Sequence, residues 1–258
     1  MFDACVNLHS EQFSANPWAV IERGFEAGIT GMGLTGSCLE SSRLAIELAQ
    51  QNPDKLCATV GLHPHSAKDF SPELMDAFRE MATHPIVRAI GECGLDHFRN
   101  ISTPTQQREC FIAHLNLARE LQKPLFLHQR DAFTEFIDIM DTHAPNVPTL
   151  VHCFTDGITE LKALLERGYL VGITGWIADT RRNQELLAAI PSLPLEQMLI
   201  ETDAPWLTPR NIPKFRKIKA NEPKYLSYVV EAISQATGHA VEDIINHSTQ
   251  NARHFFGW

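Results

Sequence analysis

The chain contains 258 residues, of which 31 are acidic and 22 are basic, so its formal net charge is −9 with histidine neutral. Hydrophobic residues make up 44% and charged residues 21%, which excludes a disordered chain, a fibrous repeat and a coiled coil. No stretch of about 18 apolar residues is present, so the sequence predicts no transmembrane helix. The first residues lack the basic and apolar regions of a signal peptide, and we expect a cytoplasmic protein.

The cysteines show no sign of a disulfide framework. The six cysteines are Cys5, Cys38, Cys57, Cys93, Cys110 and Cys153. No pair has the C-x-x-C spacing, and a chain of this length does not depend on a disulfide framework, so we expect buried free thiols. The net acidity argues mildly against broad nonspecific binding to nucleic acid, although it leaves room for a local basic patch.

Short apolar segments alternate with longer segments of helical periodicity along the chain. The predicted strands are Phe2–Leu8, Gly31–Thr35, Leu56–Gly61, Ile86–Glu92, Leu125–His128, Thr149–Phe154, Leu170–Thr174 and Met198–Thr202. The predicted helices are Pro17–Ala27, Glu40–Gln51, Pro72–Thr83, Pro104–Gln122, Asp131–His143, Ile158–Arg167, Arg181–Ile190, Pro223–Ala236 and a last helix, Val241–Phe255. Eight such strand–helix units in about 250 residues predict an α/β fold, a single (β/α)8 TIM-type barrel domain over residues 1–258 with an extra C-terminal helix.

Local signals support these elements. Ser71 and Thr103 each precede a proline, which places a capping oxygen before a residue that has no N–H group. The segment Leu125–Leu127 is apolar throughout, as expected for parallel strands that are covered on both faces. A doubly wound open sheet is the alternative, but the glycine-rich phosphate-binding pattern that usually follows its first strand is absent.

Polar side chains follow the carboxyl ends of the predicted strands, where a barrel places its chemistry. The fourth and fifth predicted strands end at Glu92 and His128, and the sixth contains His152 near its end. Asp203 follows the eighth predicted strand, and His63 follows the third. Each residue alone is explained by an ordinary hydrogen bond or a helix cap. A closed barrel brings them onto one rim, where two imidazoles and two carboxylates are costly unless a divalent cation compensates them. The sequence therefore predicts a metal site.

The ligand types leave the identity of the metal open. A mixed set of imidazoles and carboxylates suits zinc or manganese, and magnesium can bind when water and a substrate phosphate complete its shell. Such a site predicts hydrolysis, because a bound metal lowers the pKa of water from about 15.7 to about 7. Cys93 and Cys153 adjoin predicted ligands, but neighbouring strand residues point to opposite faces, so we expect both thiols to pack away from the site.

Basic residues gather on the same predicted rim. Arg99 lies in the loop after the fourth predicted strand, and Arg130 follows His128 by two positions. The loop after the eighth strand contains Arg210, Lys214, Arg216, Lys217 and Lys219. This region is a frequent phosphate site in the fold, and Trp206 and Phe215 in the same stretch are suited to stacking on bases. The cluster predicts a phosphodiester substrate rather than a sugar or a neutral amide.

Six motifs follow one another in register through the chain. They are Gly61–His65 (GLHPH), Gly91–Asp96 (GECGLD), His128–Ala132 (HQRDA), Val151–Phe154 (VHCF), Glu201–Trp206 (ETDAPW) and Asn221–Pro223 (NEP). This series resembles that of the TatD-type metal-dependent deoxyribonucleases over the whole chain. The resemblance implies a magnesium-supported 3′→5′ exonuclease acting on single-stranded DNA and RNA, with a role in the repair of oxidatively damaged DNA. We expect a monomer that has no obligate protein partner and does not contact a membrane.

The resemblance also implies roles for individual residues. Glu92, His128 and His152 would be metal ligands, with Glu92 essential for catalysis, and Asp203 would be a ligand or the base that activates water. The predicted substrate contacts are His63, Arg130, Asn221 and Arg210.

The first predicted strand departs from the family pattern. Many relatives carry Asp-x-His-x-His there, and its two histidines hold a second metal, whereas Cys5 and Asn7 occupy those positions in this chain. The departure argues against a permanent two-metal site, and it leaves Asn7 and His65 as the candidate ligands of a second cation that arrives with the substrate. His9 lies two residues further on and is either a partial substitute or a surface histidine.

Two other functions remain open from the sequence. A small-molecule amidohydrolase or phosphotriesterase would share the metal rim, but such enzymes commonly use the histidine pair of the first strand and a modified lysine where Glu92 stands. A barrel that binds metal or nucleic acid without turnover is supported only by the altered first strand. The full set of four predicted ligands argues against it.

Overall fold

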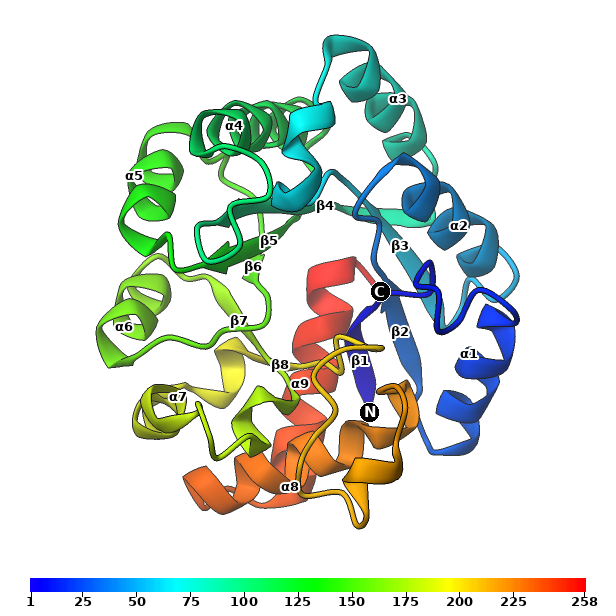
Figure 1. Ribbon diagram of the computed structural model, residues 1–258, viewed down its shortest axis with the longest axis vertical. Coiled ribbons are helices and arrows are strands. Elements are labelled where there is room, and N and C mark those ends of the chain that lie inside the picture. The colour runs from blue at the N-terminus through cyan, green and yellow to red at the C-terminus, as the bar shows by residue number, and fades with distance from the viewer. The chain divides into compact units, whose positions relative to one another are not determined.

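The computed structural model describes residues 1–258 and contains one eight-stranded sheet in the order β1 to β8 (Figure 1). The strands are β1 Phe2–Val6, β2 Gly31–Leu34, β3 Leu56–Val60, β4 Val87–Asp96, β5 Leu125–Arg130, β6 Thr149–Val151, β7 Leu170–Ile173 and β8 Met198–Ile200. The helices are α1 Pro17–Glu26, α2 Leu39–Ala49, α3 Pro72–Ala82, α4 Pro104–Leu121, α5 Phe133–His143, α6 Ile158–Glu166, α7 Gln184–Ala189, α8 Leu226–Thr237 and α9 Val241–Phe256. Every predicted element overlaps one of these. None of the helices has the length and apolar character needed to cross a membrane.

The residues form two compact units. The central unit comprises residues 34–152, and the terminal unit comprises residues 1–33 and 153–258. The single domain over residues 1–258 stays a prediction.

In the central unit, the parallel strands β3, β4, β5 and β6 pair in chain order, with Ile90 opposite Leu125 and Leu125 opposite Thr149. Helices α2 to α5 lie along the outside of these strands (Figure 1). Between strands and helices, the rings of Phe111 and Phe136 stack with centroids 5.5 Å apart, and both side chains are fully buried. The continuous apolar strands are thus covered by helices, as parallel strands require.

Strand β4 is longer than its sequence predicts. The prediction ends at Glu92, but the strand continues to Asp96 beyond a shift of register against β5. Gly94 has a φ of 143°, and a Cβ atom there would overlap the carbonyl oxygen of His128. Only glycine permits this approach. It brings both Glu92 and Asp96 alongside the end of β5.

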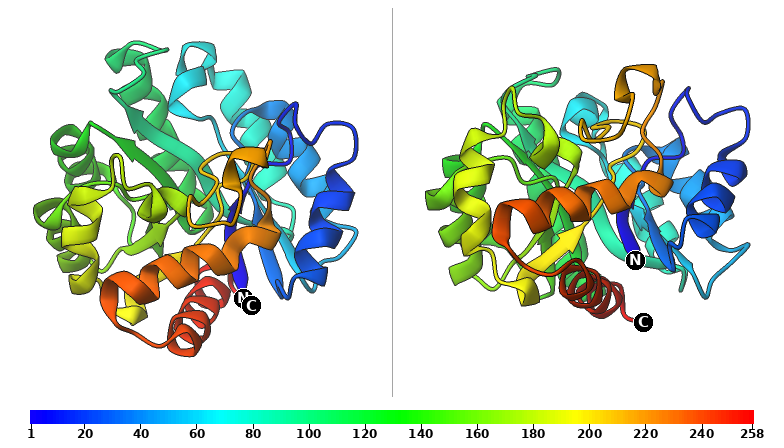
Figure 2. Two further views of the ribbon diagram at one scale, coloured as in Figure 1. Left: turned by 60° about the horizontal axis from the view of Figure 1, so that its bottom comes forward. Right: turned by 90° about the horizontal axis from the view of Figure 1, so that it is seen from below.

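In the terminal unit, β7 pairs with β8, and β1 meets the segment after β8 through a bridge between Val6 and Ala204. Helix α9 packs on β1 and β8. The ring of Phe2 lies 5.5 Å from that of Phe256 and 5.3 Å from that of Trp258, so the two ends of the chain lie close together (Figure 2).

Helix α7 is shorter than predicted, because residues of its first predicted turn bind a carboxylate instead of continuing the helix. The guanidinium groups of Arg181 and Arg182 bind the carboxylate of Asp179, at 2.6 and 3.0 Å. The backbone therefore makes a turn before the helix begins at Gln184. Basic side chains are also unfavourable in the first turn of a helix, where the helix dipole is positive.

A buried histidine supports the segment that leads into His63. The Nδ1–H group of His114 donates to the carbonyl oxygen of Cys110 at 2.8 Å, and its Nε2 accepts from the backbone N–H of Leu62 at 3.1 Å. Burial lowers the pKa of His114 from 6.5 to about 4. The ring is therefore neutral in the folded chain at neutral pH.

His114 should make stability depend on pH. Below pH 6.5 the unfolded chain takes up a proton on this ring and the folded chain does not until about pH 4, so stability falls as the pH falls through this window. Between pH 7 and pH 5 we expect the native chain to lose about 2 kcal/mol more unfolding free energy than His114→Gln. Urea unfolding of both proteins at the two pH values measures this difference. Equal losses of unfolding free energy in the two proteins would show that the ring of His114 is not held neutral in the folded chain.

Candidate functional site

Three imidazoles surround one carboxylate oxygen in the central unit. His63 follows β3, Glu92 lies in β4, His128 lies in β5 and His152 directly follows β6. The Oε1 atom of Glu92 lies 2.8 Å from Nε2 of His152, 3.0 Å from Nδ1 of His128 and 3.3 Å from Nε2 of His63. Four of the predicted site residues therefore lie together.

The electrostatics of this cluster favour a charged carboxylate. Glu92 is only 5% exposed, and burial alone would raise its pKa. The neighbouring rings of His63, His152 and His128 outweigh burial and hold the pKa of Glu92 well below its ordinary range. Burial lowers the pKa of His63 to about 4, which keeps that imidazole neutral at neutral pH.

The residues of the cluster fit a divalent cation. His63, Glu92 and His128 each offer a ligand atom, and these three atoms lie within 4.8 Å of one another. The Nε2 atom of His128 is buried without a hydrogen-bond partner, and its Nδ1 lies only 3.3 Å from Nε2 of His152. A carboxylate with neutral imidazoles is a donor set typical of zinc, manganese and related ions.

Asp96 and His65 support this cluster from one side. Nε2 of His65 lies 2.6 Å from Oδ2 of Asp96, and the same oxygen lies 3.6 Å from Nε2 of His128. Burial would raise the pKa of Asp96, but the neighbouring rings of His128 and His65 hold it far below its ordinary value. Asp96 was not among the predicted site residues, because the predicted strand ended at Glu92, although Asp96 is the last residue of the GECGLD motif.

In the terminal unit, the residues that replace the first-strand histidines contact Asp203. The side-chain amide of Asn7 donates to Oδ1 of Asp203 at 2.9 Å, and the thiol of Cys5 lies 3.5 Å from the same oxygen. Asp203 has a φ of 53° and Asn7 is buried. Asn7 and His65, the predicted ligands of a second cation, thus have different carboxylate partners.

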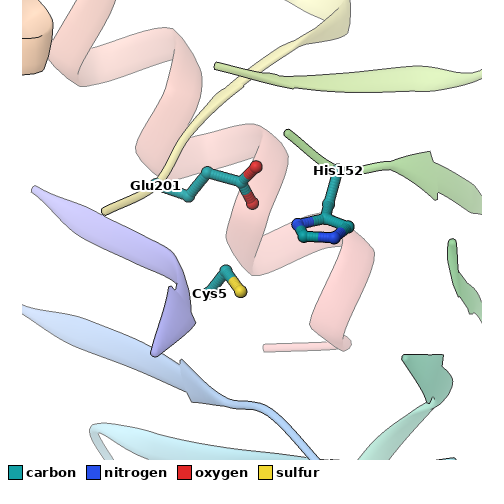
Figure 3. A group of neighbouring side chains, drawn as sticks. All are labelled: Cys5, His152 and Glu201. Atoms are coloured by element: carbon teal, nitrogen blue, oxygen red, sulfur yellow. The ribbon is translucent and has the colours of Figure 1, made fainter. Parts of the chain in front are cut away.

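A second buried carboxylate lies near Cys5. Glu201 is fully buried and accepts a hydrogen bond from the backbone N–H of Cys153. Figure 3 shows the Cys5 thiol and the Glu201 carboxylate directed into the same space, and it also draws His152, the last residue of the central unit. Glu201 belongs to the ETDAPW motif, although the sequence did not separate its role from that of Asp203.

The cysteines are free, as predicted, and most are inaccessible. Cys5, Cys57, Cys93 and Cys110 are buried, whereas Cys38 and Cys153 are partly exposed. Burial raises the pKa of the Cys110 thiol to about 12 and that of Cys93 well above its ordinary value. These thiols are therefore protonated and unsuited to nucleophilic catalysis.

The predicted substrate contacts differ in accessibility. Arg130 is partly exposed at the end of β5, and its guanidinium lies over the ring of Phe98 at 4.9 Å. Arg210 lies over Phe215 at 4.5 Å. Asn221 is fully buried, and its amide donates to the carbonyl oxygen of Thr202 at 2.8 Å. That bond supports the segment before Asp203, and a direct substrate contact by Asn221 stays a prediction.

The loop after β8 carries uncompensated positive charge. Lys217 and Lys219 line a cavity of about 480 Å³ together with Arg23 and Glu222, which form an ion pair at 2.6 Å. Neither lysine lies within ion-pairing distance of an acidic group. The cavity is therefore locally positive in an acidic chain, as an anionic ligand requires.

A family model described as "TatD related DNase" matches residues 2–257. The chain belongs to the TatD family. Among TatD relatives, the "3′-5′ ssDNA/RNA exonuclease TatD" of Erwinia amylovora is 43% identical over 100% of both chains. The protein of the same name from Salmonella typhimurium is 42% identical over 99% of this chain and 98% of its own.

A solved structure shows the same fold over the full length. YJJV, a TatD homologue from Escherichia coli, superposes with a TM-score of 0.90 at 24% identity, covering 100% of this chain and 98% of its own. The predicted (β/α)8 barrel with its C-terminal helix is therefore confirmed, and so is the resemblance to the TatD family.

Proposed function

We propose that this TatD-family chain is a metal-dependent 3′→5′ exonuclease that hydrolyses phosphodiester bonds of single-stranded DNA and RNA. The observation that carries the proposal is the cluster of His63, His128 and His152 around Glu92 in a chain that belongs to this family. The substrate and the polarity are supported by the names of full-length relatives. Cytoplasmic action on oxidatively damaged DNA, as a monomer without a protein partner, is part of the same proposal.

Glu92, His128 and His152 would hold the cation, with magnesium supporting activity and manganese or zinc as alternatives. When bound, the cation polarises the phosphodiester and makes water acidic. Asp203 would accept the proton of the attacking water as oxygen bonds to phosphorus and the bond to the departing sugar oxygen breaks. The side-chain amide of Asn7 donates to Oδ1 of Asp203 and so orients this carboxylate. Arg130, His63 and the basic loop would bind phosphate oxygens.

The test uses metal-stripped protein and a single-stranded oligonucleotide carrying a label at its 5′ end. Products are resolved by length over time with Mg²⁺, Mn²⁺, Zn²⁺ or no added ion. Labelled products that shorten by one nucleotide at a time, only with an ion present, are the expected result. Immediate release of a labelled mononucleotide would show that degradation starts at the 5′ end, which contradicts the proposed polarity. No cleavage with any ion would reject the nuclease and favour a small-molecule hydrolase.

A further inference from the structure

An exposed aromatic ring lies in the loop between β4 and α4. Phe98 is 59% exposed, more than any other large apolar side chain of the protein. A single exposed apolar residue needs no special explanation. This ring, however, is flanked by two cations, since the guanidinium carbon of Arg130 lies 4.9 Å and that of Arg99 lies 5.9 Å from its centroid.

The loop that carries Phe98 is held firmly at both ends. The buried side chain of Gln107 accepts from the backbone N–H of Asp96 at 2.7 Å, and it donates to the carbonyl oxygens of Asp96 at 3.1 Å and Ser102 at 2.9 Å. Within the loop, Asn100 donates to the carbonyl oxygen of His97 at 2.7 Å. A ring displayed on a fixed loop loses little further conformational entropy when a ligand binds.

The loop begins at the candidate metal centre. One oxygen of Asp96 accepts from the backbone N–H of Arg99 at 2.8 Å, and the other contacts His65 and approaches His128. The backbone N–H of His97 donates to the carbonyl oxygen of Arg130 at 2.9 Å. The ring is therefore tied to the same strand ends that supply Glu92 and His128 in the central unit.

We propose that Phe98, flanked by Arg99 and Arg130, is the platform on which an unpaired base of the substrate strand stacks beside the phosphodiester that is cleaved. The inference rests on the proposed function and deepens it. A phenyl ring stacks on any base, and the two guanidinium groups suit the neighbouring phosphates. Bases within a duplex have both faces covered by their neighbours, so this platform selects single strands.

The test compares Phe98→Ala, Phe98→Leu and Phe98→Trp with the native chain. For a single-stranded octanucleotide, the alanine and leucine variants should raise KM, and the Kd from fluorescence anisotropy, by about 5- to 150-fold. The tryptophan variant should keep native values, because it retains an aromatic face. Ile101→Ala is the matched control, since Ile101 is 55% exposed in the same loop and has no ring. It should leave both constants unchanged.

A substrate series locates the base. Octanucleotides that carry one abasic nucleotide, placed in turn at each of the first positions from the cleaved end, are compared on the native chain and on Phe98→Ala. At one position, removing the base should weaken oligonucleotide binding by the native chain as much as the Phe98→Ala substitution does. At that position, removing the base should not weaken binding by Phe98→Ala any further. Equal losses of binding in both proteins at every position would reject the proposal that Phe98 stacks on a base. Native KM and Kd values for Phe98→Ala or Phe98→Leu would also reject it.

The two proposals fail in different ways. If the native chain cleaves no oligonucleotide while Kd still responds to Phe98→Ala and to the abasic position, the exonuclease proposal fails and the platform holds. If the native chain cleaves and Phe98→Ala behaves as native, the platform fails and the exonuclease stands. Each variant is checked by its melting temperature, which an exposed side chain should change little.

Discussion

Replacing Glu92 with glutamine should abolish tight metal binding and with it hydrolysis. Glutamine keeps the size of the side chain but removes the negative charge on which His63, His128 and His152 converge. Loss of an outer hydrogen-bonding partner of a metal site already costs about 10- to 100-fold in affinity, so loss of a charged ligand should cost at least about 100-fold. Titration calorimetry with Mn²⁺ and Zn²⁺ measures the affinity, and the oligonucleotide assay measures kcat.

Glu120→Gln is the matched control for that substitution. Glu120 pairs with Arg79 at 3.0 Å on the surface of the central unit, and its removal should leave metal affinity and kcat unchanged. Such exposed pairs contribute little to stability. Native metal affinity in Glu92→Gln would show that the cation binds elsewhere, for example beside Glu201. Native metal affinity together with a loss of kcat would show that Glu92 acts in the chemical step and does not hold the cation.

The second large effect is expected for Asp203→Asn, which should lower kcat by about 10²- to 10⁴-fold, the usual contribution of a general base. Asparagine tolerates the left-handed backbone at this position, and its oxygen can still accept from Asn7. The fold and most metal affinity should therefore remain. The acidic limb of the kcat profile against pH, which reports ionisation of the base, should disappear.

Asp243→Asn provides the control in the terminal unit. Asp243 is exposed in the first turn of α9 and is not among the predicted site residues, so the variant should keep native kcat and an unchanged pH profile. An Asp203→Asn enzyme with native turnover would exclude Asp203 as the base. A loss of kcat in which the acidic limb persists would assign the base to another group and leave Asp203 a role in binding the cation or the substrate.

The sequence predicts most of this architecture, because the strongest local patterns agree with the global fold. The first half of β5 and the whole of β8 are continuous apolar segments, and α4 begins where Thr103 accepts from the backbone N–H of Gln106. The ends of elements are harder to place. The extension of β4 depends on a close approach to β5 at Gly94, and glycine in a sequence more often indicates that a strand ends.

The candidate site shows the same division. Glu92, His128 and His152 can be found from the sequence, because each comes at the end of a short apolar segment. The roles of Asp96 and Phe98 cannot, since they depend on tertiary contacts with His65 and with Arg130, which lie in other segments. Likewise, nothing local indicates that Asn7 hydrogen-bonds Asp203 across 196 positions of chain.

The division of the chain into two compact units has a consequence for how its activity can change. The three histidines and Glu92 come from one uninterrupted segment, residues 34–152, whereas Asp203 and Asn7 belong to the terminal unit. On the proposed assignments, the choice of metal is encoded in one stretch of the gene, and the acid–base chemistry in the two stretches that flank it. Recombination that exchanges the central stretch between relatives would therefore transfer metal preference while leaving the proton-accepting group of the recipient in place.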